Sequence, residues 1–289
     1  MKNMLMKRMK LAGAVLLTAL LTVACGPKTD EKKIDIAYVN WSEGIAMTNL
    51  AKVIFEEQGY RVNLLNADLA PVFASLSQKK ADVFLDAWLP VTMADYITQY
   101  GDKLETLGTV YDNARIGLVV PEYVTINSIE ELNQVRARFK GEIVGIDAGA
   151  GIMKATDKAI PDYGLDYKLL TSSGPAMTAS LKKAIDKKEW VVVTGWTPHW
   201  MFDRFDLKIL ADPKGIYGGA EKIQVLAWKG FSEKDPFAAR LLSNMHLTDA
   251  QISSLMAALE EPGINETDAA RKWLETNRDV VSNWLPQIE

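Results

Sequence analysis

Three tryptophans have the position and the chemistry to bind a ligand: Trp41, Trp88 and Trp196. Trp88 and Trp196 each end a short apolar run and are followed two positions later by proline, which cannot donate to a β-ladder and so ends the strand. All three indoles are predicted at the carboxyl ends of strands, where open α/β sheets bind ligands. Indole faces attract a fully alkylated ammonium, which has no N–H group to donate, by about 0.5 to 2 kcal/mol each. The predicted chemistry is non-covalent capture of a quaternary ammonium cation, and packing of the three rings in a core is the alternative.

A glycine-rich turn supplies a second recognition element. Gly145, Gly149 and Gly151 lead into a helix-like segment, so the backbone N–H groups of Gly151 and Ile152 are predicted to point, with the helix dipole, at a small anion. An ordinary tight turn is the alternative. The glycine spacing departs from the dinucleotide fingerprint, so no nucleotide cofactor is predicted. Aromatic faces for a cation and an amide pair for a carboxylate together suit a zwitterion of the betaine type.

Acid–base, nucleophilic and metal chemistry have few candidates in this sequence. The chain has two histidines, His199 and His246, and neither has a second His, Cys or carboxylate at the spacing of a metal ligand. No activated nucleophile pairs with His199, so a structural histidine is favoured over a catalytic one. We expect no cofactor and no metal, and we do not expect an enzyme.

The elements that would position these residues occur twice. The Trp88 and Trp196 runs each follow a basic, helix-like segment, and upstream of each lies a strand, a loop and a Gly-Ile pair that enters a helix. Gly44 precedes Trp88 by 44 positions and Gly151 precedes Trp196 by 45, and matched spacing marks a repeated unit. The chain is therefore predicted to form two similar α/β lobes.

Strand and helix patterns alternate through both units, which predicts parallel sheets. A strand at 116–121 is predicted to cross between the lobes, and a strand at 223–228 to return to the first lobe. Lobe 1 is accordingly placed at 34–114 plus 218–289 and lobe 2 at 115–217, with a hinged cleft between them. The other predicted strands begin at Ile34 and Glu142 or lie at 60–65, 82–88, 168–171 and 190–196. The predicted helices lie at 45–58, 71–80 and 92–100, from Gly151 onward, and at 174–188.

Local signals predict further helices and a core. Ser128 to Glu131 form a capping-box pattern that predicts a helix. The chain after the last strand is predicted to be helical, with helix starts at Ser232 or Asp235, at Thr248 and at Asn265. The remaining tryptophans are expected in the core: Trp190, Trp200, Trp228, Trp273 and Trp284.

The first 24 residues have the pattern of a secretory signal. Basic residues precede an apolar run from Leu11 to Ala24, which is too short to span a bilayer. Cys25 follows at once and is the only cysteine of the chain. Its setting resembles a bacterial lipoprotein cleavage site, although Thr22 stands where leucine is usual. We expect a lipidated Cys25 and a polar tether at 25–33, which would anchor the protein outside the membrane; an incidental thiol is the alternative.

Charge argues against nucleic acid as a partner. The signal segment holds four of the 33 basic residues and none of the 37 acidic ones. The rest of the chain therefore carries a net charge of about −8 and has no long basic stretch.

Four motifs resemble one protein family over nearly all of the chain beyond the signal. They are Tyr38-Val-Asn-Trp41, Ala87-Trp88-Leu-Pro90, Gly145-Ile-Asp-x-Gly-x-Gly151-Ile-Met153 and Thr194-Gly-Trp196-Thr-Pro-His-Trp200-Met-Phe202. The chain resembles the glycine betaine substrate-binding lipoproteins of ABC importers. The resemblance implies a type II-like periplasmic-binding-protein fold, a hinged cleft between two parallel or mixed sheets, and a monomer that delivers an osmolyte to a permease. It also implies that Trp41, Trp88 and Trp196 cage the trimethylammonium group and that the amides of Gly151 and Ile152 hold the carboxylate.

One position departs from the family pattern. Members with this motif commonly carry a carboxylate-binding histidine five residues after the second cage tryptophan, and this chain has Met93 there. The departure implies weaker binding of glycine betaine, or preference for a relative such as choline, carnitine, proline betaine or a sulfur analogue.

Two other classes of protein are alternatives. The chain could be the ligand-sensing part of a receptor, although no further apolar span or signalling domain is expected after Trp228. It could be an extracytoplasmic enzyme on the same scaffold, although candidate acids, bases and nucleophiles are scarce. A turnover assay on a bound solute would separate the enzyme from the binding protein.

Overall fold

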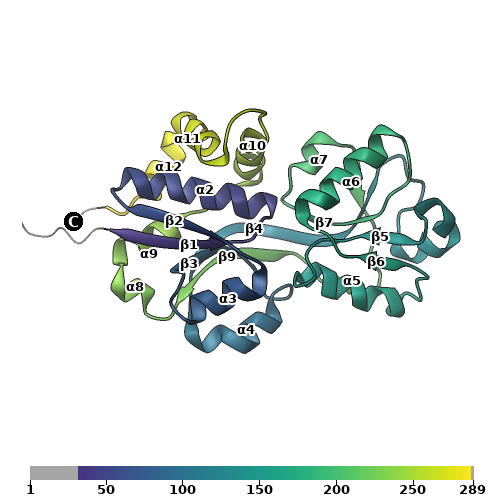
Figure 1. The fold of residues 1–289 in the computed structure, drawn as a ribbon, viewed down its shortest axis with the longest axis horizontal. Coiled ribbons are helices and arrows are strands. Elements are labelled where there is room, and N and C mark those ends of the chain that lie inside the picture. The colour runs from purple at the N-terminus through teal and green to yellow at the C-terminus, as the bar shows by residue number, and fades with distance from the viewer. Residues whose placement is uncertain (1–31, 288–289) are drawn as a thin grey trace, which may run out of the picture. The chain divides into compact units, whose positions relative to one another are not determined.

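The computed structural model describes residues 32 to 287 (Figure 1). The predicted signal at 1–24, Cys25 and the tether as far as residue 31 lie outside the described residues. None of the helices that the structure describes has both the length and the apolar character needed to cross a membrane.

Strands of the described residues form a mixed sheet of nine strands. Eight of them follow the order β2-β1-β3-β9-β4-β7-β5-β6, and β8 pairs with β4 beside this path. β1 pairs in parallel with β2 and β3, and β5 pairs in parallel with β6 and β7, whereas β4 and β9 run antiparallel to their neighbours. The strands are β1 (Lys33–Tyr38), β2 (Arg61–Asn66), β3 (Val83–Leu89), β4 (Leu104–Pro121), β5 (Glu142–Val144), β6 (Lys168–Leu170), β7 (Val193–Thr197), β8 (Leu207–Ile209) and β9 (Glu221–Trp228).

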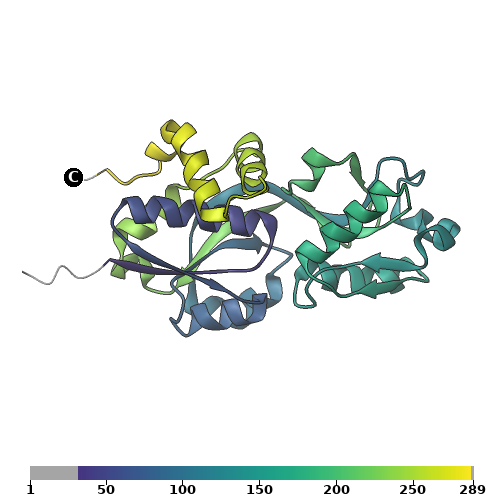
Figure 2. The ribbon, with the colours of Figure 1, turned by 45° about the horizontal axis from the view of Figure 1, so that its top comes forward.

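Strand β4 belongs to both parts of the sheet. Its residues as far as Ala114 pair with β9, and from Arg115 onward it pairs with β7. We call the first lobe the part built on β1, β2, β3, β9 and β4 as far as Ala114, and the second lobe the part built on the rest of β4 and β5 to β8. Figure 2 shows β4 and the chain that leads into β9 passing between the lobes.

Strand β4 is longer than the strand predicted at 116–121. The added part, 104–115, is interrupted by three register shifts against β9. Such bulges break the alternation of buried and exposed side chains by which a strand is recognised in a sequence. The predicted crossing segment is therefore the second half of a strand that begins in the first lobe.

Helices cover both faces of the first-lobe sheet (Figure 1). Helix α2 lies between the sheet and helices α10 and α11, so it is buried on two sides, and this explains why eleven of its sixteen residues are buried. The helices of this lobe are α2 (Ser42–Glu57), α3 (Leu69–Ser77), α4 (Ala94–Tyr100), the short 3₁₀ helix η1 (Gly101–Lys103), α8 (Phe231–Lys234), α9 (Pro236–Asn244), α10 (Asp249–Leu259), α11 (Glu266–Thr276) and α12 (Arg278–Ser282).

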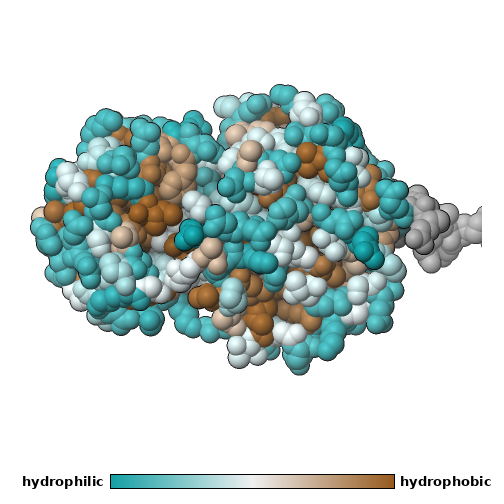
Figure 3. Space-filling model, turned by 180° about the vertical axis from the view of Figure 1, so that it is seen from behind, coloured by the Kyte–Doolittle hydropathy of each residue, from teal (hydrophilic) through white to brown (hydrophobic). Residues whose placement is uncertain are grey.

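The second lobe repeats the arrangement on a smaller scale. Its helices are η2 (Ile129–Phe139), α5 (Gly151–Asp162), α6 (Gly174–Asp186) and α7 (Met201–Arg204). In Figure 1, α5 lies on one side of the strands and α6 and α7 on the other. Viewed from behind, the boundary between the lobes forms a notch at one edge of a surface that is mostly hydrophilic (Figure 3).

Capping residues set most of the predicted helix starts. The predicted starts at Asp235, Thr248 and Asn265 are confirmed: each side chain accepts a hydrogen bond from a backbone N–H in the first turn of α9, α10 or α11. Thr248 and Gln251 form a reciprocal capping box.

The capping box predicted at Ser128 is wrong. Ser128 accepts from the N–H of Glu130, and the Glu131 carboxylate accepts from Asn127 instead of from Ser128. The element that follows, η2, is a kinked 3₁₀ helix. The sequence pattern therefore predicted the start of this element correctly, but the element is a 3₁₀ helix without a capping box.

Candidate functional site

A small cavity lies where the two lobes meet. All six residues predicted to bind ligand line this cavity: Trp41, Trp88, Met93, Gly151, Ile152 and Trp196. The other lining residues are Glu43, Thr92, Ile116, Ile146 and Ala150.

Two of the three indoles lie near the ends of strands, and the third lies just before a helix. Trp88 lies at the end of β3, Trp196 lies near the end of β7, and Trp41 is the N-cap residue of α2. Their exposed fractions are only 3 to 6%. The rings are therefore as buried as core side chains but line a cavity.

Every cavity indole donates its N–H group to an acidic side chain. The Nε1 to oxygen distances are 3.2 Å from Trp41 to Asp147, 2.8 Å from Trp88 to Asp86 and 2.7 Å from Trp196 to Glu43. These acidic partners were not among the predicted site residues. Because each N–H group already has an acceptor, what the rings offer a ligand is their aromatic surface.

Two of these acids form a buried pair. Burial raises the pKa of Glu43 to about 7. Burial and the nearby charge of Glu43 raise the pKa of Asp86 well above its usual range. Asp86 Oδ2 has no hydrogen-bond partner, and a side chain at Gly44 would begin 2.6 Å from it. Two carboxyl groups so placed cannot both ionise readily, so the pair holds a proton near neutral pH.

His199 supports one of the cavity tryptophans. Its ring meets that of Trp196 edge to face, with the centroids 4.9 Å apart, and its Nδ1 accepts from the N–H of Met201 at 3.1 Å. Burial lowers the pKa of His199 to about 3, so the ring is neutral. This is the structural role that the sequence favours.

The start of α5 forms the opposite wall of the cavity. Gly151 and Ile152 are the first two residues of this helix, so their N–H groups have no acceptor within it and lie at the positive end of its dipole. A Cβ atom on Gly151 would lie 2.1 Å from the carbonyl oxygen of Thr92 in the other lobe. Only glycine permits this approach of the two backbones.

A buried carboxylate shapes the loop that carries Met93. Glu221, at the start of β9, accepts from the N–H groups of Val91 and Thr92 at 2.5 and 2.9 Å and also bonds the Thr92 hydroxyl. Met93 follows as the N-cap residue of α4 and is 1% exposed. Its thioether brings an apolar surface, and no hydrogen-bond donor, to the cavity.

The remaining tryptophans lie away from this cavity. Trp228, Trp273 and Trp284 are buried, as predicted for core residues, and Trp190 and Trp200 are partly buried and pack against the core. Trp200 and His199 also line a neighbouring cavity beyond Trp196. Residues 32–287 contain no group of three or more His, Cys, Asp and Glu side chains that could hold a metal ion.

Comparisons with known proteins agree on one family. A family model described as the substrate binding domain of ABC-type glycine betaine transport system matches residues 32–276. The glycine betaine/carnitine transport binding protein GbuC of Listeria monocytogenes is 49% identical over 150 residues, which make up 51% of this chain and about half of that protein (50%).

Solved structures match over more of the chain. Lactococcal OpuAC, in its closed conformation with glycine betaine, is 35% identical with a TM-score of 0.84, and the match covers 89% of this chain and 100% of that one. The glycine betaine/L-proline-binding protein ProX of Borrelia burgdorferi is 36% identical with a TM-score of 0.85, covering 89% and 97%. The chain thus has the mixed α/β fold of these binding proteins, and the predicted fold class is confirmed.

Proposed function

The chain belongs to the family of substrate-binding domains of ABC-type glycine betaine transport systems, and from this premise we propose that it binds glycine betaine or a related quaternary ammonium osmolyte. It is an extracytoplasmic substrate-binding protein and not an enzyme. It hands the solute to the permease of an ABC importer.

One observation carries this proposal: three indoles from two lobes line the same small cavity as the start of α5. Aromatic faces stabilise a trimethylammonium group without hydrogen bonds. The free N–H groups of Gly151 and Ile152 suit a carboxylate at the other end of the ligand. The cavity therefore offers complementary surfaces to both charges of a betaine.

Met93 makes the identity of the preferred ligand a separate question. A thioether cannot donate a hydrogen bond to a carboxylate, so the carboxylate would rely on the α5 amides alone. Choline, carnitine, proline betaine and a sulfur analogue are the alternatives to glycine betaine, and choline needs no carboxylate contact.

The proposed lobes are 34–114 with 218–289, and 115–217. The change of β4 partner between Ala114 and Arg115 supports the first limit, and the return of the chain into β9 at Glu221 supports the last. Closure by hinge motion at these two connections brings Trp41 and Trp88 against Trp196 and α5. We further propose that the protein is a monomer tethered to the membrane by a lipid on Cys25.

Calorimetric titration with glycine betaine, carnitine and choline tests the function. We expect saturable binding of at least one of these solutes. No binding of any of them would contradict the proposal. Heat from choline alone would support the cage but not the carboxylate site.

A matched pair of variants separates binding from folding. Trp88→Ala removes a cavity ring, and Trp273→Ala removes an equally buried ring that instead bonds Ser254. Both should lower the free energy of unfolding by about 3 to 5 kcal/mol. Only Trp88→Ala should weaken ligand binding, by about 2 kcal/mol or more. Equal ligand affinities in the two variants would remove the cage from the proposal.

A further inference from the structure

Two of the three indole hydrogen bonds cross between the lobes. Trp41 precedes α2 in the first lobe, and its acceptor Asp147 lies in the loop between β5 and α5 in the second. Trp196 lies near the end of β7 in the second lobe, and its acceptor Glu43 lies in α2 of the first. Each lobe therefore supplies one indole N–H donor and one carboxylate that accepts from the indole of the other lobe.

The third indole bond differs in kind. Trp88 donates to Asp86, two residues earlier on the same strand β3, so this ring keeps its partner whether or not the lobes meet. Some other contacts between the lobes do not involve the cavity rings. They include the Tyr96 hydroxyl with the carbonyl oxygen of Gly149 and the exposed ion pair of Lys154 with Asp95.

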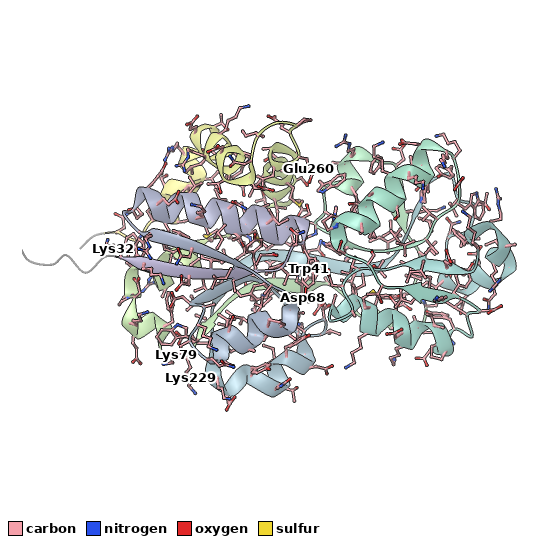
Figure 4. The ribbon with its side chains drawn as sticks, viewed as in Figure 1. Lys32, Trp41, Asp68, Lys79, Lys229 and Glu260 are labelled. Carbon is pink, nitrogen blue, oxygen red and sulfur yellow. The ribbon has the colours of Figure 1, made fainter. Side chains whose placement is uncertain are left out.

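The two crossing bonds hold rings that each line more than one cavity. Trp41 lines both the cage cavity and a larger cavity that also contains Asp68 and Asp147, and Figure 4 shows Trp41 and Asp68 at the junction of the lobes. Trp196 likewise separates the cage cavity from the one beyond it. Both rings form part of a cavity wall, and the N–H group of each donates to an acidic side chain of the opposite lobe.

We propose that Asp147 and Glu43 are positioning residues for ligand capture: each orients the cage indole of the opposite lobe, so that the aromatic cage is complete only when the lobes have closed. The inference rests on the proposed function and adds to it. With the lobes apart, Trp41 and Trp196 lose their acceptors and are free to rotate, whereas Trp88 keeps its own. Ligand therefore enters a site with one fixed ring and is held by two that become fixed on closure.

Kinetics of ligand exchange provide the main test. In the purified protein, Asp147→Ala should raise the dissociation rate of the bound quaternary ammonium solute about tenfold or more, because a hydrogen bond to a charged acceptor is lost. The association rate should change little, because the bond forms after the ligand has entered. Asp147→Asn keeps an acceptor oxygen in place and should restore much of the slow dissociation. Glu43→Gln should likewise be much milder than Glu43→Ala.

A cross-lobe contact that touches no cavity ring is the control. Asp95→Asn breaks the exposed ion pair with Lys154 and should leave both rate constants within about twofold of the wild type. If Asp147→Ala also dissociates at the wild-type rate, or if Asp147→Asn is as damaging as Asp147→Ala, the positioning role is overturned.

Indole N–H resonances in the NMR spectrum test the same contacts without relying on ligand affinity. In the closed protein, Asp147→Ala should shift the Trp41 resonance and leave that of Trp88 in place. Unchanged Trp41 and Trp196 resonances in the Asp147 and Glu43 variants would overturn the inference. A wild type that binds none of the solutes would contradict the proposed function, and the resonance shifts would still decide on the crossing bonds.

Discussion

At the scale of single residues, the acid partners of the indoles determine how the cavity can act. Trp41 and Trp228 are almost equally buried, at 6 and 7% exposed, and both donate to an aspartate. They differ in that Trp41 lines a cavity, whereas Lys79 lies over the Trp228 ring at 4.1 Å. A tryptophan is available to a ligand cation only where the protein has not supplied a cation of its own.

Met93 gives the first prediction. Met93→His places a donor beside the amides of Gly151 and Ile152, so it should tighten carboxylate-bearing ligands by about tenfold. Choline has no carboxylate and should gain nothing. Parallel titrations of wild type and variant with glycine betaine and choline measure the difference. An equal gain for both ligands would show that the new side chain acts by packing alone.

Glu43 gives a prediction on pH. Its pKa is raised from 4.5 to about 7 in the folded protein, so the folded state binds the proton more tightly than the unfolded state does. The stability that this provides is complete below pH 4.5 and is lost as the pH rises through about 7, by an amount on the order of 3 kcal/mol. Urea unfolding of the ligand-free wild type and of Glu43→Gln from pH 4.5 to 8 should show this decline as a difference between the two proteins, because the lowered pKa of His199 makes the stability of both rise as far as about pH 6.5.

Glu43→Gln is the control for this prediction. It removes the titrating group, so the decline in the free energy of unfolding that Glu43 causes should be lost. The slope that remains includes Asp86, whose pKa is raised, and His199, whose lowered pKa acts in the opposite direction. The groups that act on the Glu43 carboxyl are Asp86 and the Trp196 N–H. A bound cation favours the ionised form, so ligand affinity should rise over the same pH range. Identical pH slopes in wild type and Glu43→Gln would refute the assignment.

Sequence reasoning found the rings but not their acid partners. Trp88 and Trp196 stand out because a local pattern repeats. Asp147 lies 106 positions from Trp41, and Glu43 lies 153 positions from Trp196, the tryptophans whose N–H groups donate to them. No local pattern encodes such a pairing, because it exists only after two lobes have folded and met. Asp86 is close in sequence to Trp88, but its burial beside Glu43 again depends on packing.

At the scale of elements, the start of α5 gives the third prediction. Gly151→Ala would place a methyl group 2.1 Å from the Thr92 carbonyl oxygen. Relief of this clash should cost about 2 kcal/mol, which lowers ligand affinity about thirtyfold. Titration with the tightest ligand measures the loss.

Gly149→Ala is a matched control for this helix start. Its new methyl group would lie 3.4 Å from the Tyr96 hydroxyl, which is an ordinary contact. Its affinity should stay close to that of the wild type. Similar losses in both variants would mean that the loop before α5, and not the approach of Thr92, limits binding.

Helix starts that depend on a capping residue were predictable from the sequence, whereas bounds that depend on pairing with distant segments were not. Helices α9, α10 and α11 begin at their capping residues, because the cap satisfies N–H groups of the same turn. The first part of β4 carries bulges that only its pairing with β9 explains. Helix α2 begins at Ser42, three residues before the predicted start, and its second residue, Glu43, accepts a hydrogen bond from Trp196 of the other lobe.

At the scale of the whole molecule, the proposed anchor gives the fourth prediction. Cys25→Ser removes the thiol that would be lipidated, so the protein should move from the membrane fraction to the soluble extracytoplasmic fraction. Incorporation of a labelled fatty acid should be lost at the same time. Ligand affinity should not change, because the cavity lies within the body that begins at Lys33. Membrane association that persists in the variant would contradict the anchor.

The crossed indole bonds have a consequence for how affinity is tuned. If only the closed form holds the ligand, the apparent dissociation constant is the intrinsic one divided by the fraction of molecules able to close. Substitutions at the lobe contacts can shift that fraction without altering any surface that touches the solute. Selection can thus match the protein to scarce or plentiful solute through its conformational equilibrium, while the chemistry of recognition stays unchanged.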